Sequence, residues 1–245
     1  MARGSSTKLV GSNPFVARRG IKLWLLDLFF PRQCLHCGCE GTWLCPEGQA
    51  KLAPLTEYRC YRCHEVQATT ATCANCQSLT ALDGVWVMSS YHGAVVEPLI
   101  RLIKYHYITD LVGYIGVLVT RYLKRAPEWS SDAVLVPVPL HWRRYAERGF
   151  NQSELLAHVI HEVTNNPVDS ILLQRATYHQ PQAKLSAAGR RQNVRNGFKV
   201  GSRQIPEQVV LIDDVCTTGT TLEVCAQALK AAGVKEVRAL VIARG

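Results

Sequence analysis

The period of the hydrophobic positions changes along the chain. From residue 84 onward, apolar runs that alternate or are continuous predict strands, and apolar residues at steps of three and four predict helices. The predicted strands cover 85–91, 134–138, 171–174, 209–212 and 237–243, and the predicted helices cover 95–105, 111–124, 151–162, 186–193 and 222–232. Strands alternating with helices predict an α/β fold with a mostly parallel sheet, helices on both faces, and ligands at the carboxyl ends of the strands.

The residues before 84 follow different patterns. Residues 1–20 are basic, polar and rich in Gly and Ser, which predicts a disordered lead-in. Residues 21–30 are apolar apart from Lys22 and Asp27 and predict a short amphipathic helix, because ten residues are too few to span a bilayer. We therefore expect a cytoplasmic protein with no membrane span, divided into the lead-in 1–20, an N-terminal helix and cysteine-rich module 21–80, and an α/β domain 84–245.

Eight of the ten cysteines lie between Cys34 and Cys76. In a chain without an evident export signal, such clustering predicts metal ligation rather than disulfides. Two C-x-x-C pairs, nine residues apart, can each present two thiolates to one tetrahedral ion. We predict that they bind a structural zinc ion, which would stabilise a module with little core of its own. This second cluster consists of Cys60, Cys63, Cys73 and Cys76.

The first cluster is less regular and consists of Cys34, Cys37, Cys39 and Cys45. Cys37 and Cys39 lie closer together in the sequence than the two ligands of a standard zinc-ribbon turn. Three outcomes stay open: Cys39 completes a second zinc site, His36 completes it, or no metal binds here.

Two carboxylates and a turn of small residues follow the strand predicted at 209–212. Asp213 and Asp214 would lie at its carboxyl end, where they can accept hydrogen bonds from vicinal ribose hydroxyls and hold Mg²⁺. Backbone N–H groups of the next turn can converge on a phosphate at the positive end of the helix dipole. Two acids with this turn exceed what an N-cap requires, which favours a site for a phosphorylated sugar. The turn, termed the phosphate loop, consists of Thr217, Thr218, Gly219, Thr220 and Thr221.

The phosphate loop resembles the phosphoribosyl-pyrophosphate loop of type I phosphoribosyltransferases. Other phosphate-binding motifs are absent from the sequence, since neither G-x-x-x-x-G-K-[ST] nor G-x-G-x-x-G occurs. Together with the segments 91–106, 136–141, 148–152 and 180–198, the order of motifs from about residue 23 resembles the ComF family. The resemblance implies a zinc module before a phosphoribosyltransferase-type domain, and an association with natural competence and the use of imported DNA. It also implies a cysteine at position 48, where this chain has Gly48.

The positive charge is concentrated in one segment. The formal net charge is +9, and residues 141–203 hold ten Lys and Arg against four Asp and Glu. This favours a polyanionic partner such as pyrophosphate, a nucleotide or single-stranded DNA, with a solvated basic face as the alternative. Arg148 and Arg144 can aim guanidinium groups at a pyrophosphate, whereas Arg143 and Arg144 are adjacent and cannot easily both face it. The segment with Gln182, Lys184, Arg190 and Asn193 resembles the mobile loop that covers the ligand.

The resemblance implies displacement at the anomeric carbon of phosphoribosyl pyrophosphate, with Mg²⁺ neutralising the leaving group. No acceptor is evident, and Thr217 stands where relatives that act on 6-oxopurines carry a carboxylate, which disfavours purine salvage. Three hypotheses follow. The first is an accessory protein that binds phosphoribosyl pyrophosphate and acts with DNA-uptake proteins on incoming single-stranded DNA. The second is an active phosphoribosyltransferase of nucleotide metabolism, and the third is a zinc-ribbon interaction protein on a non-catalytic scaffold.

Overall fold

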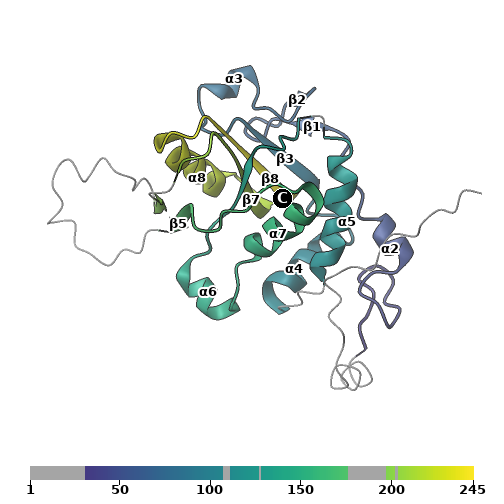
Figure 1. Ribbon diagram of the computed structural model, residues 1–245. Helices are drawn as coiled ribbons and strands as arrows, with labels where there is room; N and C mark the ends of the chain where they lie inside the picture. Colours follow the sequence, from purple (N-terminus) through teal and green to yellow (C-terminus); the bar gives the residue numbers. More distant parts are fainter. Residues whose placement is uncertain (1–30, 107–110, 127, 176–196, 202–203) are drawn as a thin grey trace, which may run out of the picture.

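The computed structural model describes residues 31–106, 111–126, 128–175, 197–201 and 204–245 (Figure 1). The predicted lead-in at 1–20, the predicted helix at 21–30 and the predicted helix at 186–193 lie outside the described residues.

Four parallel strands form the central sheet. Their order is β3 (Gly84–Ser90), β8 (Glu236–Arg244), β7 (Gln208–Cys216) and β4 (Val134–Pro137). The core strand β7 pairs with β8 through Ile212 and Leu240, and with β4 through Leu211 and Val136. This sheet confirms the predicted α/β class.

Helices cover both faces of the sheet (Figure 1). One face packs against α4 (Val96–His106), α5 (Val112–Leu123) and α7 (Gln152–Thr164), and the other packs against α8 (Thr220–Ala231). Because successive side chains of a strand point to opposite faces, Val210 and Ile212 enter the first core, and Val209 and Leu211 enter the second. Burial on both faces explains why β7 is continuously apolar up to Asp213.

The two cysteine clusters lie in separate short segments. The first segment contains α2 (Pro46–Ala50) and packs against α5, where the hydroxyls of Thr42 and Tyr114 are 3.3 Å apart and Arg121 donates to the Gln49 carbonyl at 2.7 Å. The second segment contains β1 (Tyr58–Arg59), β2 (Val66–Gln67) and α3 (Ala74–Gln77). It lies near α8 and the start of β3 (Figure 1).

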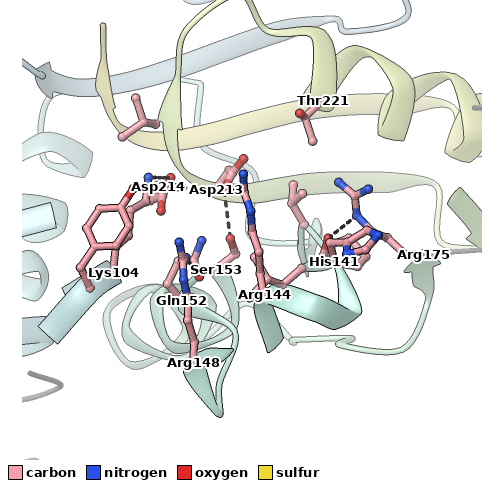
Figure 2. A pocket seen from close by; sticks show the side chains of 15 residues that line it. Lys104, His141, Arg144, Arg148, Gln152, Ser153, Arg175, Asp213, Asp214 and Thr221 are labelled. Atoms are coloured by element: carbon pink, nitrogen blue, oxygen red, sulfur yellow. Dashed lines mark hydrogen bonds and ion pairs between the residues drawn. The ribbon is translucent and has the colours of Figure 1, made fainter. Parts of the chain in front are cut away.

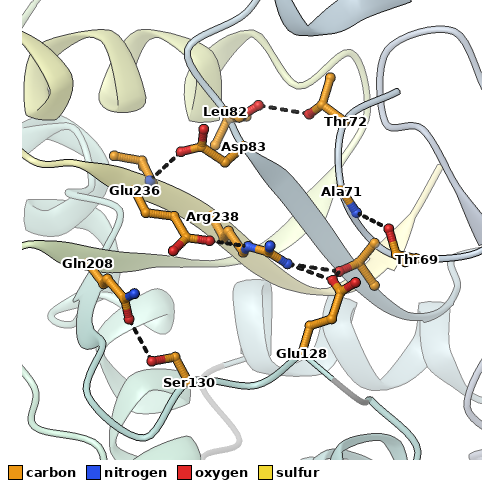
Figure 3. A network of polar contacts seen from close by, with 12 residues as sticks. Thr69, Ala71, Thr72, Leu82, Asp83, Glu128, Ser130, Gln208, Glu236 and Arg238 are labelled. Carbon is orange, nitrogen blue, oxygen red and sulfur yellow. Dashed lines mark hydrogen bonds and ion pairs between the residues drawn. The ribbon is translucent and has the colours of Figure 1, made fainter. Parts of the chain in front are cut away.

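A polar network anchors the second segment at the amino ends of β7 and β8 (Figure 3). Arg238 donates to Glu128 and to Glu236, each at 2.7 Å, and the Thr70 hydroxyl donates to the same Glu128 carboxylate at 2.9 Å. Thr70 lies between Cys63 and Cys73 in the sequence. The segment is therefore held to the sheet at a point remote from the carboxyl ends of the strands.

Three local features differ from the sequence predictions. The strand predicted at 171–174 begins at Leu173 as β5 (Leu173–Arg175), and it pairs antiparallel with β6 (Phe198–Val200) outside the central sheet. Between the predicted strand 134–138 and the predicted helix 151–162, where the sequence predicted no element, the chain forms the helix α6 (Trp142–Arg148), which buries no residue and therefore has no apolar periodicity to reveal it. Strand β7 continues through the two aspartates to Cys216 instead of ending before them.

Candidate functional site

A cavity of about 480 Å³ lies at the carboxyl ends of β4 and β7 (Figure 2). Its walls come from the end of α4, the connection from β4 to α6, α6 itself, the start of α7, β5, β7 and the start of α8. Small-molecule sites in proteins enclose roughly 300–1,000 Å³, so this cavity has the size of a ligand pocket. We refer to it as the pocket.

Asp213 is held in place by the start of α7. Its Oδ1 accepts from the Ser153 hydroxyl at 3.0 Å and from the Asp214 N–H at 2.9 Å. Ser153 is positioned in turn by Asn151, the N-cap of α7, whose Oδ1 accepts from the Ser153 N–H and whose amide donates to the Val138 carbonyl. Burial, together with the charge of Asp214, raises the pKa of Asp213 to about 7. A bound cation would therefore displace a proton from this carboxyl group near neutral pH.

Asp214 offers one oxygen that is not satisfied within the described residues. Its side chain is only 8% exposed, and Oδ1 forms an ion pair with Lys104 Nζ at 2.9 Å (Figure 2). Oδ2 is buried and has no hydrogen-bond partner among the described residues. Leaving a buried acceptor unpaired costs about 1–3 kcal/mol, and a ligand hydroxyl or a hard cation such as Mg²⁺ would supply the missing interaction. The aspartate pair therefore fits the predicted Mg²⁺.

Cationic side chains surround the two aspartates. Lys104, Arg144, Arg148 and Arg175 all line the pocket, so four positive charges face two carboxylates. Arg148 donates to the Gln152 side chain at 3.0 Å, and Arg175 donates to the Pro139 carbonyl at 3.2 Å. The excess positive charge suits an anionic ligand that brings its own metal ion.

The two adjacent arginines of α6 point in different directions. Arg144 lines the pocket and points toward Asp213 (Figure 2), whereas the Arg143 guanidinium lies 5.3 Å from the centroid of the Trp142 ring. Of the two, Arg144 is therefore the one that can bind an anion in the pocket.

The phosphate loop forms a smaller hollow of about 50 Å³ that shares Asp213, Val215 and Thr221 with the pocket. Gly219 is the N-cap of α8 and has a φ of +74°, which favours glycine. The N-cap Gly219 has no side chain to cap α8, and among the described residues only a long contact of 3.4 Å, from the Thr220 N–H to the Thr218 hydroxyl, engages the start of the helix from a side chain. N–H groups there can bind an anion at the positive end of the helix dipole. All five predicted residues therefore lie in one turn beside the aspartates.

Comparisons with known proteins agree with this geometry. Residues 191–245 match the family described as phosphoribosyl transferase domain. Competence protein F of Haemophilus influenzae is 32% identical over 161 residues, which cover 62% of this chain and 70% of that protein. The chain belongs to the competence protein F family.

Other relatives are consistent with this assignment to the ComF family. The DNA utilization protein YhgH of Escherichia coli is 30% identical over 152 residues, which cover 61% of this chain and 67% of that protein. The competence protein ComFC of Bacillus subtilis is 31% identical over 99 residues, which cover 39% of this chain and 38% of that protein. In the described part of this ComF chain, every helix is too short or too polar to cross a membrane.

The second cysteine cluster has the geometry of a zinc site. The four sulfur atoms of Cys60, Cys63, Cys73 and Cys76 lie within 4.8 Å of one another, and those of Cys63 and Cys73 are 3.5 Å apart. A tetrahedral zinc ion with bonds of about 2.3 Å holds its sulfur ligands about 3.8 Å apart. Burial would raise the pKa of the Cys60 thiol, but the backbone N–H groups of Cys63, Cys73 and Arg62 outweigh it and lower that pKa to about 6. Burial raises the pKa of the Cys73 and Cys76 thiols, so a zinc ion would have to displace their protons on binding. The geometry of the cluster fits zinc, and Cys60 offers a ready thiolate.

The first cluster is also assembled, although its spacing is irregular. The sulfur atoms of Cys34, Cys37, Cys39 and Cys45 lie within 4.8 Å of one another. This geometry favours Cys39, rather than His36, among the alternatives left open by the sequence. At the position where the ComF pattern has a cysteine, Gly48 instead donates its N–H to the Cys45 sulfur at 3.3 Å. The first cluster could therefore hold a second zinc ion.

Some pocket residues were not identified from the sequence. Lys104 lies in the last turn of α4, after the buried Ile103, where a cation is common for electrostatic reasons. Ser153 lies in the first turn of α7, where serine is common, and Arg175 lies at the end of the short strand β5 with no accompanying motif. The predicted ligand-covering segment with Gln182, Lys184, Arg190 and Asn193 lies outside the described residues.

Proposed function

We propose that the pocket binds phosphoribosyl pyrophosphate together with Mg²⁺. The observation that carries this proposal is the aspartate pair, in which the buried Oδ2 of Asp214 has no partner among the described residues, beside the phosphate loop in a cationic pocket. The loop would take the 5-phosphate, and Asp213 and Asp214 would take the ribose hydroxyls and the cation. Arg144 and Arg148 would neutralise the pyrophosphate.

Calorimetric titration of phosphoribosyl pyrophosphate, with and without Mg²⁺, tests this proposal. We expect Mg²⁺-dependent binding that decreases at least about a hundredfold in the double variant Asp213→Ala/Asp214→Ala, because removing charge-paired ligand contacts costs about 3 kcal/mol or more. Asp132→Ala removes an exposed carboxylate at the opposite end of β4 and serves as the control. Equal affinity in the double variant and the wild type would refute the assignment.

We also propose that the protein is an accessory factor in competence or in the use of imported single-stranded DNA, acting with DNA-uptake proteins. The relatives' names, competence protein F and DNA utilization protein, support this role. The exposed helix α6 supports it as well, because Trp142 is 54% exposed, Tyr145 is 51% exposed, and Arg143 covers the Trp142 ring. Exposed aromatic rings next to arginines are typical of surfaces that stack the bases of single strands.

Binding of a single-stranded oligonucleotide at several salt concentrations tests the role of α6. We expect the logarithm of the affinity to fall with the logarithm of the salt concentration by about 0.7 per phosphate contacted. Trp142→Ala should weaken binding by about 1–3 kcal/mol for a stacked base. Val163→Ala truncates another partly exposed apolar side chain, on α7, and should leave the affinity unchanged. Equal losses in both variants would contradict a stacking role for α6.

The same preparations distinguish the remaining hypotheses. Release of pyrophosphate in the presence of a candidate base or single-stranded DNA would identify the protein as an active phosphoribosyltransferase. A wild-type protein that binds zinc but neither phosphoribosyl pyrophosphate nor DNA would instead favour a zinc-ribbon interaction protein on a non-catalytic scaffold.

A further inference from the structure

The C-x-x-C turn from Cys60 to Cys63 contacts the phosphate loop through Tyr61. Tyr61 follows Cys60 in the sequence, is 5% exposed, and packs in the same core as Cys216 and Leu222, which flank the loop. A Cβ placed on Gly219 would lie only 3.1 Å from two carbon atoms of the Tyr61 ring. The ring of Tyr61, the residue after a predicted metal ligand, therefore packs directly against Gly219 and leaves little room there for a side chain.

A single carboxylate at the start of α8 joins the loop to both ends of the second segment. Glu223 accepts hydrogen bonds from the Tyr61 hydroxyl at 2.9 Å, from the Thr80 hydroxyl, and from the Ala81 N–H at 2.9 Å. Its own N–H donates to the Gly219 carbonyl at 2.9 Å, which closes the first turn of α8. The loop and its helix are thus bonded to residues that follow Cys60 and Cys76 in the chain.

A third connection lies on the other side of the loop. Arg244, at the end of β8, donates to the Tyr61 carbonyl at 2.5 Å and lies 2.9 Å from Nε2 of His64. In the sheet register, Arg244 is paired with Cys216, the residue that precedes the loop. Both ends of the loop are therefore tied to the chain between Cys60 and His64.

We propose that the second cluster is a positioning element for the phosphate loop, so that the affinity for a phosphorylated ligand depends on metal occupancy of this cluster. This inference rests on the proposed function of the loop as a phosphate site. The metal fixes the turn from Cys60 to Cys63, this turn fixes Tyr61, and Tyr61 with Glu223 fixes the first turn of α8. Among the described residues, the first cluster has no such path, because its segment contacts α5 through Tyr114 and Arg121.

Thermodynamic linkage makes the proposal reciprocal. If metal in the second cluster strengthens ligand binding, then bound ligand must strengthen metal binding in that cluster by the same factor. Couplings between sites in proteins typically amount to about 5- to 150-fold in affinity. Phosphoribosyl pyrophosphate should therefore protect one of two zinc ions from a chelator and leave the other unprotected.

The chain offers a matched pair of variants for the test. Cys63 and Cys37 are both exposed cysteines, one in each cluster. In the full-length protein with Mg²⁺, we expect Cys63→Ser to weaken binding of phosphoribosyl pyrophosphate by about tenfold or more, within the usual range of coupling, and Cys37→Ser to change it less than about twofold. Zinc content, measured on the same samples, should fall by one ion per chain in each variant.

Hydrogen exchange provides a readout that needs no ligand. In Cys63→Ser, the amides at the start of α8 should exchange faster while those of α7 stay protected, and Cys37→Ser should leave both unchanged. Wild-type protein that fails to bind phosphoribosyl pyrophosphate would refute the proposed function, yet faster exchange confined to α8 in Cys63→Ser would still support the coupling. Cys63→Ser protein that has lost zinc but retains normal exchange and normal affinity would overturn the coupling.

Tyr61→Phe keeps the test decisive if Cys63→Ser does not fold. This variant retains all four cysteines and the ring, and the Arg238 network continues to anchor the segment at the far end of the sheet. We expect full zinc content with ligand affinity reduced by about threefold or more, because one hydrogen bond to a carboxylate is lost. Full zinc content with unchanged affinity would show that Tyr61 does not transmit the coupling and would overturn this mechanism.

Discussion

The two cysteine clusters resemble each other in chemistry and differ in what they touch. Each gathers four thiols within 4.8 Å. In each, the thiol pKa of one buried cysteine, Cys34 or Cys60, is lowered to about 6 by backbone N–H groups that outweigh burial. The first cluster lies against α5, a helix that packs in the hydrophobic core. The second lies against the start of α8, where the phosphate loop ends.

The spacing of the cysteines in the sequence therefore does not indicate whether a cluster lies beside the ligand site. The second cluster has the regular spacing of a zinc ribbon, and Tyr61, which lies between two of its cysteines, donates a hydrogen bond to Glu223. In the described part of the chain, no residue of the first cluster's segment does so. The first has an irregular spacing, yet its sulfur atoms are equally close together. We infer that both clusters stabilise the N-terminal segments, whereas only the second also determines the shape of the ligand site.

The largest expected effect is loss of metal. Cys34→Ser and Cys60→Ser are matched, because both cysteines are buried and both have a thiol pKa lowered to about 6. Each variant should lose one of two zinc ions, and the free energy of unfolding should fall by several kcal/mol, since zinc binding contributes ~10–16 kcal/mol in zinc-finger peptides. Elemental analysis and denaturant unfolding provide the measurements. A metal-free native protein with wild-type stability would contradict both zinc assignments.

A pair of glycines isolates the contact between the second cluster and the loop. Gly219 and Gly149 share a φ of +74°, but a Cβ on Gly149 meets nothing within 4 Å, whereas on Gly219 it lies 3.1 Å from the Tyr61 ring. Gly149→Ala should cost about 1–2 kcal/mol of unfolding free energy from the backbone alone. Gly219→Ala should cost about 1–3 kcal/mol more, as overpacking does, and should weaken ligand binding. Equal unfolding free energies in the two variants would show that Tyr61 does not confine the loop.

One tyrosine hydroxyl beside each cluster makes a hydrogen bond, so removing each hydroxyl in turn compares how the two segments are held. Tyr61 donates to the Glu223 carboxylate, whereas the hydroxyl of Tyr114 meets the neutral hydroxyl of Thr42 beside the first cluster. Tyr61→Phe should lower the free energy of unfolding by about 1.5–3 kcal/mol and Tyr114→Phe by about 0.5–1.5 kcal/mol, because hydrogen bonds to charged groups are stronger. Thermal unfolding measures both, and a larger loss in Tyr114→Phe would reverse the comparison.

The pH dependence separates the chemistry of the pocket from the influence of the clusters. Burial and the charge of Asp214 raise the pKa of Asp213 from its ordinary 3.8 to about 7. Between pH 4 and pH 7, the ligand-free folded protein therefore holds a proton on Asp213 that the unfolded chain has already released. The contribution of Asp213 to the free energy of unfolding of the ligand-free protein should therefore fall as the pH rises from 4 to 7.

A cation must displace the same proton, so affinity for phosphoribosyl pyrophosphate with Mg²⁺ should increase about tenfold from pH 6 to pH 8. Cys37→Ser should show the same midpoint near pH 7 as the wild type, because the first cluster contributes none of the groups that shift the pKa of Asp213. Titrations at several pH values measure this, and an affinity that falls toward pH 8 would contradict it.

The sheet and the phosphate loop were predictable because their signals are local. The apolar run of β7, the two acids and the small-residue turn each constrain the backbone within a few residues. The helix α6 was missed because every residue in it is at least partly exposed, so no apolar face marks it. Lys104 and Ser153 were missed because their roles depend on Asp214 and Asp213, which lie 110 and 60 residues away along the chain.

The contact between the second cluster and the loop was also invisible in the sequence. Tyr61 lies within a C-x-x-C turn, and Glu223 lies in the first turn of a helix, where an acidic residue is common for electrostatic reasons. Nothing in either local pattern identifies the other residue as its partner. Only the packing of the N-terminal segment on α8 brings the two together.

A crystal structure of the full-length protein with phosphoribosyl pyrophosphate and Mn²⁺ in place of Mg²⁺ tests the central claim most directly. Anomalous scattering should place one zinc ion in each cysteine cluster and one manganese ion at Asp213 and Asp214. The 5-phosphate should bind the N–H groups of residues 217–221, with Tyr61 still packed against Gly219. A ligand bound away from the aspartate pair, or a phosphate loop that binds the ligand after separating from Tyr61, would contradict the account.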